Sequence, residues 1–496
     1  MLNQNFIVMK SISELTTKRP WLNWVIFFAT VMVVFLLGLF ASSIIERRSE
    51  AKLYFQMVTE IPEWEPRSAV WGENFPRQYE SYMRTADTLF ASAHGGSATI
   101  DYLEKYPELV ILWAGNAFSR DYKQSRGHFY SVSDVHQSLR TVQHQPATCW
   151  TCKSTDVPRL MAEMGVAEFY ASSLNDLGHE ATNHIGCQDC HDPQTMNLRI
   201  TRPALAEAFQ RIGRDVEQAT HQEMRSLACA QCHVEYYFKG KGNYLTFPWD
   251  KGFGAMDMER YYDSIGHTDW VHALSRAPML KAQHPDYELF LTGVHADRGV
   301  SCADCHMPYK RDGGLKFTDH HITSPLQNIS GSCMVCHRES EEKLLANVNE
   351  RQNKIYELRR IAETNLARLH IEAKIAWDEG ATEEQMKPVL TLIRHAQWRW
   401  DWVAAAKGMG FHSPLECARV LGSSIQKSQE ARILLNTILV NKGVNVPVEM
   451  PDISTRAKAQ QFIGLDMIQI RSSKQQFLNE TLPKWLQAAV ERDESM

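Results

Sequence analysis

The hydrophobic pattern divides the chain into an apolar start, an irregular middle and a periodic end. Near the start, Trp21 to Ile45 contain no Asp, Glu, Lys or Arg, and this run is long enough for a helix to cross a membrane. Basic residues flank it on both sides, so charge alone leaves its orientation open. We predict a transmembrane anchor over residues 21–45, after an N-terminal segment of residues 1–20. A cleaved signal peptide is the alternative, because Ala41-Ser42-Ser43 offers small residues for cleavage.

The middle of the chain, from Glu50 to about Lys343, keeps a helical period only over short stretches. Gly, Pro and aromatic residues interrupt it repeatedly, which is typical of loops with short helices. Five Cys-x-x-Cys pairs begin at residues 149, 187, 229, 302 and 333. Their unequal spacing argues against a tandem repeat.

A helical period dominates after Cys336. Apolar residues recur at three-, four- and seven-residue steps or their sums, at Leu344, Val348, Ile355, Leu358 and Leu369. This pattern predicts a long amphipathic helix. Further helices are predicted over Glu383 to about Lys407, Pro414 to Val440 and Thr455 to Arg492. We therefore divide the chain after the anchor into an irregular region, 46–343, and a long-helix region, 344–496, that packs as a bundle or forms a dimer interface.

Composition excludes two broad classes. Of the 496 residues, 44% are hydrophobic and 22% are charged, with a formal net charge of -5. This is ordinary globular composition and not that of a disordered chain. The near balance of charge gives no support to a nucleic-acid binder, which neutralises phosphates with an excess of basic residues.

Four of the cysteine pairs are followed directly by histidine, and Cys-x-x-Cys-His is the motif of covalent c-type haem attachment. Two thioethers fix the porphyrin, and the adjacent histidine becomes an axial iron ligand. Zinc knuckles and disulfides are the alternatives, but neither requires a histidine after every second cysteine. The four motifs are Cys187-x-x-Cys190-His191, Cys229-x-x-Cys232-His233, Cys302-x-x-Cys305-His306 and Cys333-x-x-Cys336-His337. The remaining Cys417 is interpreted as a small buried residue.

The first pair has lysine in place of histidine, in Cys149-Trp-Thr-Cys152-Lys153. Beside four intact motifs, we interpret it as a fifth haem site whose proximal ligand is the neutral Lys153 amine. One iron then differs from the other four. That haem is the candidate for substrate chemistry, and the histidine-ligated haems would carry electrons.

This combination closely resembles the pentahaem cytochrome c nitrite reductases, which reduce nitrite to ammonium. The resemblance extends from about Trp113 to at least Glu416, and Cys229-Ala-Gln-Cys-His-Val-Glu-Tyr-Tyr-Phe, Leu280-Lys-Ala-Gln-His-Pro, Arg126-Gly-His and Gln397-Trp-Arg-Trp-Asp support it. It implies five covalently bound haem c groups, calcium and a mainly α multihaem fold, with a loop-rich haem-packing region and long C-terminal helices. Little sheet is expected, because closely packed haems replace much of the apolar core.

The resemblance assigns three catalytic residues: Arg140 holds nitrite, His284 donates protons, and Tyr236 assists proton delivery. From the residues alone, Arg140 could be a surface residue, Tyr236 packing and His284 a haem ligand. The loop from Thr141 to Thr148 departs from the family pattern by being short, so Arg126 competes with Arg140 for the role of the arginine.

The resemblance also implies a calcium site built from the Glu235 carboxylate, the Gln283 amide oxygen and the backbone carbonyls of Tyr236 and Lys281. These are hard oxygen donors of the kind that calcium prefers. The ammonium group of Lys281 cannot bind a cation, so only its carbonyl is suitable. From spacing alone, an ordinary salt-bridged surface cluster would be the simpler reading.

By motif match, four distal histidines complete the electron-transfer haems. His128 is paired with His233, His320 with His191, His295 with His337 and His412 with His306. His321 and His395 are rival ligands. A haem with both axial positions filled does not bind substrate.

Haem attachment also orients the chain, because bacteria attach c-type haem outside the cytoplasm. We therefore expect residues 1–20 inside and the remainder on the periplasmic side of the inner membrane, or soluble in the periplasm after cleavage. The resemblance further implies a menaquinol-linked, membrane-bound multihaem quinol dehydrogenase as electron donor, and a homodimer formed through the C-terminal helices. Two other functions remain open: an electron carrier without chemistry of its own, and a multihaem enzyme acting on hydroxylamine, tetrathionate or sulfite.

Overall fold

The computed structural model describes residues 19–53, 57–141 and 145–495. Contacts divide the chain into two units, residues 1–60 and residues 61–496. The first unit contains helix α2 (Trp21–Leu53), whose segment Trp21–Arg47 is long and apolar enough to cross a membrane and is not buried. The predicted apolar helix is therefore present. Most of the predicted N-terminal segment, residues 1–18, lies outside the described residues.

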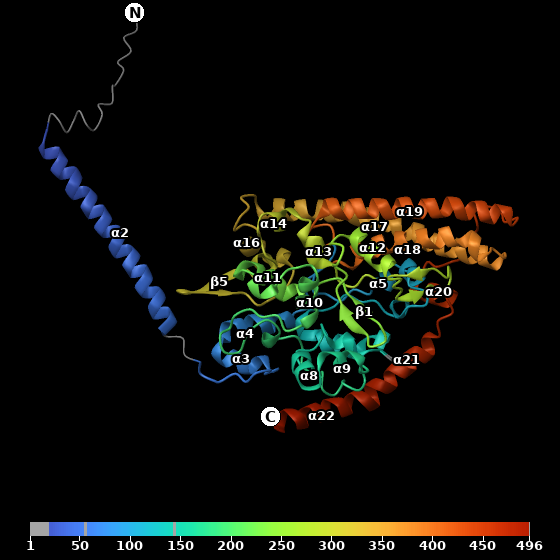
Figure 1. Ribbon diagram of the computed structural model, residues 1–496, viewed down its shortest axis with the longest axis horizontal. Coiled ribbons are helices and arrows are strands. Elements are labelled where there is room, and N and C mark those ends of the chain that lie inside the picture. The colour runs from blue at the N-terminus through green and yellow to red at the C-terminus, as the bar shows by residue number, and fades with distance from the viewer. Residues whose placement is uncertain (1–18, 54–56, 142–144, 496) are drawn as a thin grey trace, which may run out of the picture. The chain divides into compact units, whose positions relative to one another are not determined.

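Residues 61–340 of the second unit carry the five cysteine motifs and form the haem-motif part of the structure. This part consists of short helices joined by loops, as the interrupted pattern predicts (Figure 1). None of its described helices is longer than 10 residues. The α-helices are α3 (Ser68–Asn74), α4 (Pro76–Met83), α5 (Tyr102–Lys105), α6 (Glu108–Leu112), α7 (Ser131–Gln137), α8 (Val157–Met164), α9 (Val166–Ala171), α10 (Pro203–Arg211), α11 (His221–Ala230), α12 (Ala255–Ser264), α13 (Asp286–Leu291), α14 (Val294–Asp297), α15 (Cys302–His306) and α16 (Ile329–Ser332). The 3-10 turns are η1 (Arg84–Ala86), η2 (Ala117–Ser119), η3 (His128–Tyr130), η4 (Leu139–Thr141), η5 (Ala147–Trp150), η6 (Cys187–Asp189), η7 (Val216–Gln218) and η8 (Pro325–Gln327).

Sheet structure in the described residues is limited to three antiparallel pairs of short strands. They are β1 (Tyr237–Lys239) with β2 (Tyr244–Thr246), β3 (Trp270–Val271) with β4 (Pro278–Met279), and β5 (Tyr309–Asp312) with β6 (Leu315–Thr318). In the first pair Phe238 is opposite Leu245, and in the last Lys310 is opposite Phe317. The expectation of a mainly α fold with little sheet is confirmed.

Three long helices lie side by side in the C-terminal half: α17 (Glu341–Asp378), α18 (Glu383–Ala405) and α19 (Pro414–Asn441) (Figure 1). Local sequence sets where they begin. The Ser340 side chain accepts the Lys343 N–H, Thr382 and Gln385 form a capping box, and Pro414 opens α19. All three match helices predicted from the apolar period.

The fourth predicted helix, over Thr455 to Arg492, is wrong as a single element. The chain instead forms α20 (Arg456–Phe462), α21 (Met467–Gln476), a π-type turn η9 (Phe477–Thr481) and α22 (Leu482–Ser495). Gly464 has a φ of 74°, a left-handed conformation that ends the first helix. Asp466 then accepts the N–H groups of Ile468 and Gln469 and starts α21.

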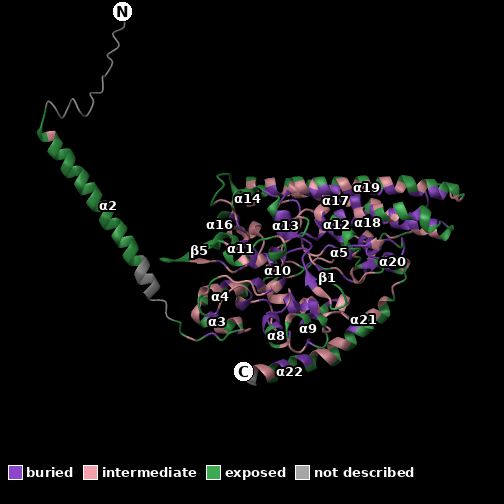
Figure 2. Cartoon of the chain, viewed as in Figure 1, coloured by how far each residue is buried: buried purple, intermediate pink, exposed green. Residues whose placement is uncertain are grey.

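The C-terminal half of helix α18, from Ile393 on, is mostly buried and anchors the loops around it (Figure 2). Trp398, Trp400 and Trp402 are fully buried. Trp398 Nε1 donates to the Ala255 carbonyl at 2.7 Å, and Gln397 Nε2 donates to the Leu112 carbonyl at 2.7 Å. The long helices thus fix segments of the haem-motif part by hydrogen bonds as well as by packing. Cys417, on α19, is buried as predicted.

Candidate functional site

A single large cavity receives every side chain assigned to haem binding or catalysis by the sequence. Its volume is about 2020 Å³, above the roughly 300–1,000 Å³ of ordinary ligand pockets. All five cysteine motifs line it, together with the four distal histidines and with Arg140, Tyr236 and His284. The rivals His321 and His395 do not line it, and His395 Nε2 lies 2.7 Å from Asp263 Oδ2.

The four predicted histidine pairs are all present. The ring centroids lie 6.3 Å apart for His128 and His233, 6.1 Å for His191 and His320, 6.3 Å for His295 and His337, and 6.4 Å for His306 and His412. A metal held by two imidazole nitrogens, each at about 2 Å, requires ring centres about 6 Å apart. The four pairs therefore fit four bis-histidine haem irons.

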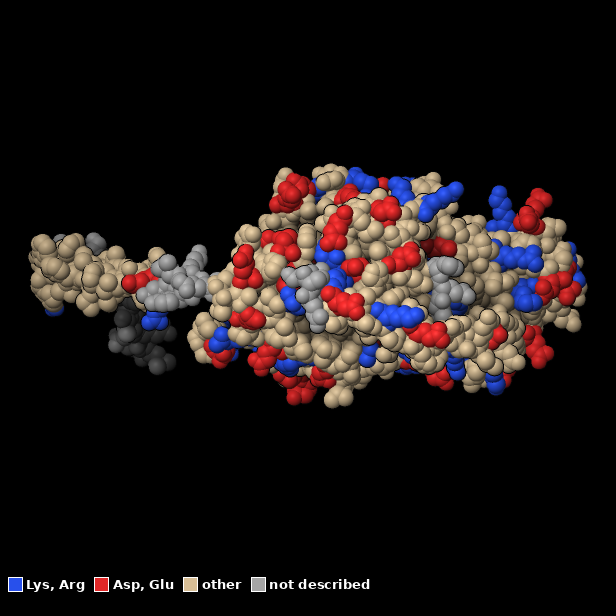
Figure 3. All heavy atoms as spheres, turned by 90° about the horizontal axis from the view of Figure 1, so that it is seen from below, with Lys and Arg blue, Asp and Glu red and all other residues tan. Residues whose placement is uncertain are grey.

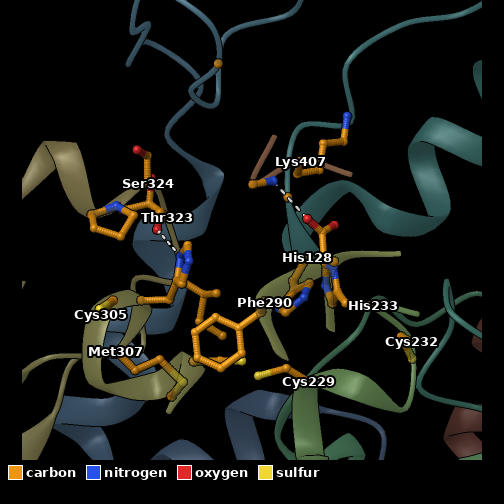
Figure 4. A pocket seen from close by; sticks show the side chains of 18 of the residues that line it. His128, Cys229, Cys232, His233, Phe290, Cys305, Met307, Thr323, Ser324 and Lys407 are labelled. Atoms are coloured by element: carbon orange, nitrogen blue, oxygen red, sulfur yellow. Dashed lines mark hydrogen bonds between the residues drawn. The ribbon is translucent and has the colours of Figure 1, made fainter. Parts of the chain in front are cut away.

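Backbone carbonyls orient several of these rings. His191 Nδ1 lies 2.9 Å from the Met196 carbonyl and His320 Nδ1 lies 2.8 Å from the Thr318 carbonyl. His306 Nδ1 lies 2.9 Å from the Thr323 carbonyl, the contact dashed beside Thr323 in Figure 4. An N–H at Nδ1 leaves Nε2 as the metal-binding atom.

Burial also favours the neutral imidazole that iron binds. Desolvation lowers the pKa of His320 and of His412 to about 4. It lowers the pKa of His191 and of His306 as well. Neutral rings at physiological pH are the form required of haem ligands.

The cysteines are not arranged as a zinc site. In the described part of the chain, the one group of three or more His, Cys, Asp or Glu residues whose ligand atoms all lie within 4.8 Å of one another is His233, His284 and Asp286. It contains no cysteine, whereas a structural zinc knuckle brings cysteine pairs together at one ion. The geometry thus fits haem attachment and not the zinc alternative.

Lys153 follows the 3-10 turn η5 at the wall of the cavity. Its N–H donates to the Trp150 carbonyl at 2.8 Å, and its own carbonyl accepts the Ser131 hydroxyl at 2.7 Å. Desolvation lowers the pKa of the Lys153 amine, and the charge of nearby Arg140 lowers it further. Both effects favour the neutral amine that can bind iron.

Arg140 and its competitor Arg126 differ in how their charge is compensated. Arg126 Nε donates to Asp134 Oδ1 at 2.8 Å. Arg140 Nε contacts only the Ser138 hydroxyl, at 3.3 Å, and its guanidinium lies 4.4 Å from the centre of the Phe118 ring. No ion pair with Arg140 occurs among the described residues, so its charge is available to an anion, whereas the charge of Arg126 is compensated by Asp134. Residues 142–144 of the adjoining loop lie outside the described residues.

His284 is held by a carboxylate that the sequence reasoning missed. His284 Nδ1 lies 2.8 Å from Asp286 Oδ2, and Asp286 Oδ1 accepts the Gly408 N–H at 2.8 Å. Asp286 is buried, and the histidines around it, His284 first, lower its pKa despite its burial. The sequence did contain an indication of this contact, because Asp286 directly follows the His284-Pro285 pair.

Tyr236 faces the same cavity near the lysine motif. Burial raises the pKa of its hydroxyl, and the neighbouring Cys152 and Cys149 thiols raise it further, while Arg140 lowers it. Its ring stacks on Phe238 with centroids 5.9 Å apart. A neutral phenol able to donate a proton follows from this environment.

The predicted calcium ligands cluster beside His284. Glu235 is fully buried, and its Oε2 accepts the Gln283 N–H at 2.7 Å. Gln283 Nε2 lies 3.1 Å from the Lys281 carbonyl oxygen. Rotating the side-chain amide by half a turn would exchange Nε2 and Oε1, and would place the amide oxygen beside that carbonyl. Lys281 Nζ pairs with Asp401 at 2.8 Å, so its carbonyl is the group that faces Gln283. The oxygen donors fit a hard cation.

The fold and the cavity together define a mainly α multihaem cytochrome c. The family model of cytochrome c552 matches residues 67–493, and the chain belongs to this family. Cytochrome c-552 of Parabacteroides distasonis is 55% identical over 483 residues, covering 96% of this chain and 98% of that protein. Cytochrome c-552 of Bacteroides thetaiotaomicron is 54% identical over 479 residues, covering 95% of this chain and 97% of that protein.

A solved structure shares the fold. The catalytic subunit NrfA of the cytochrome c nitrite reductase from Desulfovibrio desulfuricans, described with two calcium sites, has a TM-score of 0.73. It is 30% identical, and the match covers 83% of this chain and 91% of that chain. The resemblance to cytochrome c nitrite reductases is thereby confirmed, and with it the class of enzyme, an oxidoreductase.

Proposed function

We propose that this protein reduces nitrite to ammonium, with six electrons, at a haem c attached to Cys149 and Cys152 and ligated by Lys153. One contrast carries the proposal. The four motif histidines each face a second imidazole at bis-histidine distance, whereas the described residues bring the cation Arg140 close to Lys153. Four haems then conduct electrons, and the fifth is left for substrate.

Cys149, Cys152 and Lys153 would hold the haem, which when bound would supply the iron for nitrite and the electrons for its reduction. Arg140 attracts the anion and hydrogen-bonds its oxygens, because its guanidinium has no carboxylate partner among the described residues. Asp286 holds His284 at Nδ1, so Nε2 is the atom that donates a proton to a departing oxygen. The Tyr236 hydroxyl, neutral in its buried position, assists proton delivery.

The calcium ion is proposed to bind the Glu235 carboxylate, the Gln283 amide oxygen and the carbonyls of Tyr236 and Lys281. It would link the segment that carries Tyr236 to the segment that carries His284. The calcium sites described for the Desulfovibrio desulfuricans subunit support this assignment. Removal of calcium with a chelator is expected to lower activity, which added calcium restores, and Glu235→Gln is expected to abolish that restoration.

The anchor, location and assembly also belong to the proposal. The exposed apolar helix Trp21–Arg47 supports an anchor on the periplasmic side of the inner membrane, with a soluble periplasmic protein after cleavage as the alternative. Electrons would come from a menaquinol-linked membrane multihaem quinol dehydrogenase. Exposed apolar side chains on α17 and α19 support a homodimer through these helices: Ile361, Ile433, Leu434 and Val440.

The test is an assay of the purified holoprotein with a chemically reduced low-potential dye and nitrite. Near-stoichiometric ammonium, at six electrons for each nitrite, is the expected result. Dye oxidation without ammonium would favour another substrate or an earlier product. Haems that are reduced by the dye but not reoxidised by nitrite would favour an electron carrier.

A further inference from the structure

Arg202 is a fully buried guanidinium that lies behind the wall of the cavity, outside every motif singled out from the sequence. It precedes α10 and has no exposed surface. Its Nε donates to the Thr151 carbonyl at 2.8 Å, and its Nη2 donates to the Ser154 carbonyl at 3.0 Å. These two carbonyls flank Lys153 along the chain. One rigid group therefore fixes the backbone on both sides of the proposed lysine ligand.

The same guanidinium reaches a second attachment motif. Arg202 Nη2 forms an ion pair with Asp189 Oδ1 at 2.7 Å, and Asp189 is the residue between Gln188 and Cys190. Asp189 Oδ2 accepts the Gly186 N–H at 2.7 Å, which closes the loop that begins at Cys187. The loops of the Lys153 and His191 motifs are thus joined through one arginine.

A third motif joins them through Gln231, which lies between Cys229 and Cys232. Gln231 Nε2 donates to the Asp189 carbonyl at 2.8 Å, and its Oε1 accepts the backbone N–H of Arg202 at 3.2 Å. Thr151, Asp189 and Gln231 occupy the positions that a Cys-x-x-Cys motif leaves free. Asp189 and Gln231 take part through their side chains and Thr151 through its backbone carbonyl. With Arg202 they form a polar hub that connects three of the five attachment loops.

A buried cation is stable only where hydrogen bonds and an opposite charge surround it. The planar fork of arginine supplies several donors in fixed directions, which a lysine ammonium cannot copy. At Arg202 these directions match the carbonyls of Thr151 and Ser154 and the Thr201 hydroxyl, which accepts from Nη1 at 2.7 Å. The Asp189 carboxylate supplies the opposite charge. The site around Arg202 therefore requires the shape of a guanidinium group as well as its positive charge.

We propose that Arg202 is a positioning residue that sets the geometry of the Lys153 ligand and locks the Lys153 haem against the haems of His191 and His233. The inference rests on the proposed ligation of a haem by Lys153. Outer-shell partners of metal ligands orient the ligand, and their loss typically costs about 10–100-fold in affinity or activity. Arg202 acts here through backbone carbonyls and does not touch the substrate.

The chain offers a matched control in a second arginine–aspartate pair. Arg225 Nη2 donates to Asp304 Oδ1 at 2.9 Å, and Asp304 Oδ2 accepts the Ser301 N–H at 2.7 Å. Asp304 stands in the Cys302 motif at the position that Asp189 has in the Cys187 motif. Arg225→Lys thus disturbs the same kind of contact at a different haem, that of His306.

The experiment compares Arg202→Lys and Arg225→Lys in the full-length holoprotein. Arg202→Lys is expected to retain five haems by mass, to leave the signals of the His306 and His337 haems unchanged, and to alter the electron paramagnetic resonance signal of the Lys153 haem. Its kcat for nitrite should fall about tenfold or more, with little change in KM. Arg225→Lys should leave the Lys153 haem signal as in the wild type.

Asp189→Asn provides a second variant in case Arg202→Lys does not fold. It removes the ion pair, keeps an oxygen for the Gly186 N–H, and should alter the Lys153 haem signal in the same direction. A wild-type Lys153 haem signal in both variants, or an equal disturbance of all five haems, would overturn the inference. If the wild type itself forms no ammonium or shows no distinct fifth haem, the proposed function fails instead.

Discussion

The imidazole rings of His306 and His412 face each other with centroids 6.4 Å apart. His306 ends the short helix α15, whereas His412 lies in the turn between the long helices α18 and α19. The pair shows that the long-helix region contributes directly to the cavity. Helices that look like a separate bundle in the sequence are therefore part of the site's framework.

Lys153→His is expected to retain five covalent haems and to lose most nitrite turnover. The two cysteines that hold the porphyrin are unchanged, but an imidazole is shorter than the lysine side chain and differs as an iron ligand. Intact-protein mass gives the haem count, and ammonium formation gives turnover. Wild-type turnover in this variant would remove the special role of the lysine.

His284→Ala is expected to lower kcat by about 10²–10⁴-fold, the usual contribution of a general acid, with all haems attached. Asp286→Asn should cause a smaller loss, because it keeps a side chain of the same shape but no longer fixes the ring at Nδ1 by a carboxylate. His395→Ala, at the ion pair with Asp263 outside the cavity, is the control. Equal rates for the His284 and His395 variants would contradict the assignment.

Arg140→Gln is expected to raise KM for nitrite and to lower kcat/KM by tenfold or more, because a hydrogen bond to a charged group contributes about 1.5–3 kcal/mol. Arg126→Gln should retain most activity, since the Arg126 guanidinium is already paired with Asp134. Steady-state kinetics on both variants decide between them. The opposite ranking would make Arg126 the anion-binding residue.

Acid is expected to destabilise the fold through His370. This ring is fully buried, with Nε2 2.7 Å from Gln397 Oε1 and Nδ1 2.9 Å from Ser275 Oγ. Burial lowers its pKa to about 4, below the value of about 6.5 in an unfolded chain. Between these pH values the unfolded state binds the extra proton, so the free energy of unfolding falls as pH falls, by about 3 kcal/mol at most.

The thermal midpoint measured at pH 7 and pH 5 tests this expectation. His370→Gln removes the titrating group, and the midpoint of this variant should fall less between the two pH values than that of the wild type. An identical fall would assign the acid sensitivity to other groups.

Sequence reasoning recovered what short motifs and periodicity encode. The cysteine motifs predicted haem-binding positions that all line one cavity, and the family resemblance paired histidines whose rings lie about 6 Å apart there. Apolar steps located α17, α18 and α19. It joined α20, α21 and α22 into one helix because the apolar period continues across Gly464 and Asp466. The left-handed glycine and the capping aspartate interrupt the helix without interrupting the pattern.

Contacts between segments that are distant in the chain could not be predicted from motifs or periodicity. Arg202 meets Thr151, Ser154 and Asp189 only after three loops have packed together. The position of Asp286 depends on a hydrogen bond from Gly408, just beyond the end of α18, a contact that the sequence does not indicate. Likewise, basic and acidic side chains are interspersed on the face of the second unit that Figure 3 shows, so the charge on that face does not indicate where the site lies.

The most direct test of a distinct, substrate-binding Lys153 haem is spectroscopic: the five ferric haems of the purified protein are recorded by electron paramagnetic resonance before and after nitrite is added. One haem is expected to give a signal unlike the four bis-histidine signals, that signal alone should change on adding nitrite, and it should be altered in Lys153→His. Five haems of bis-histidine type, or a response from a histidine-ligated haem, would contradict this assignment.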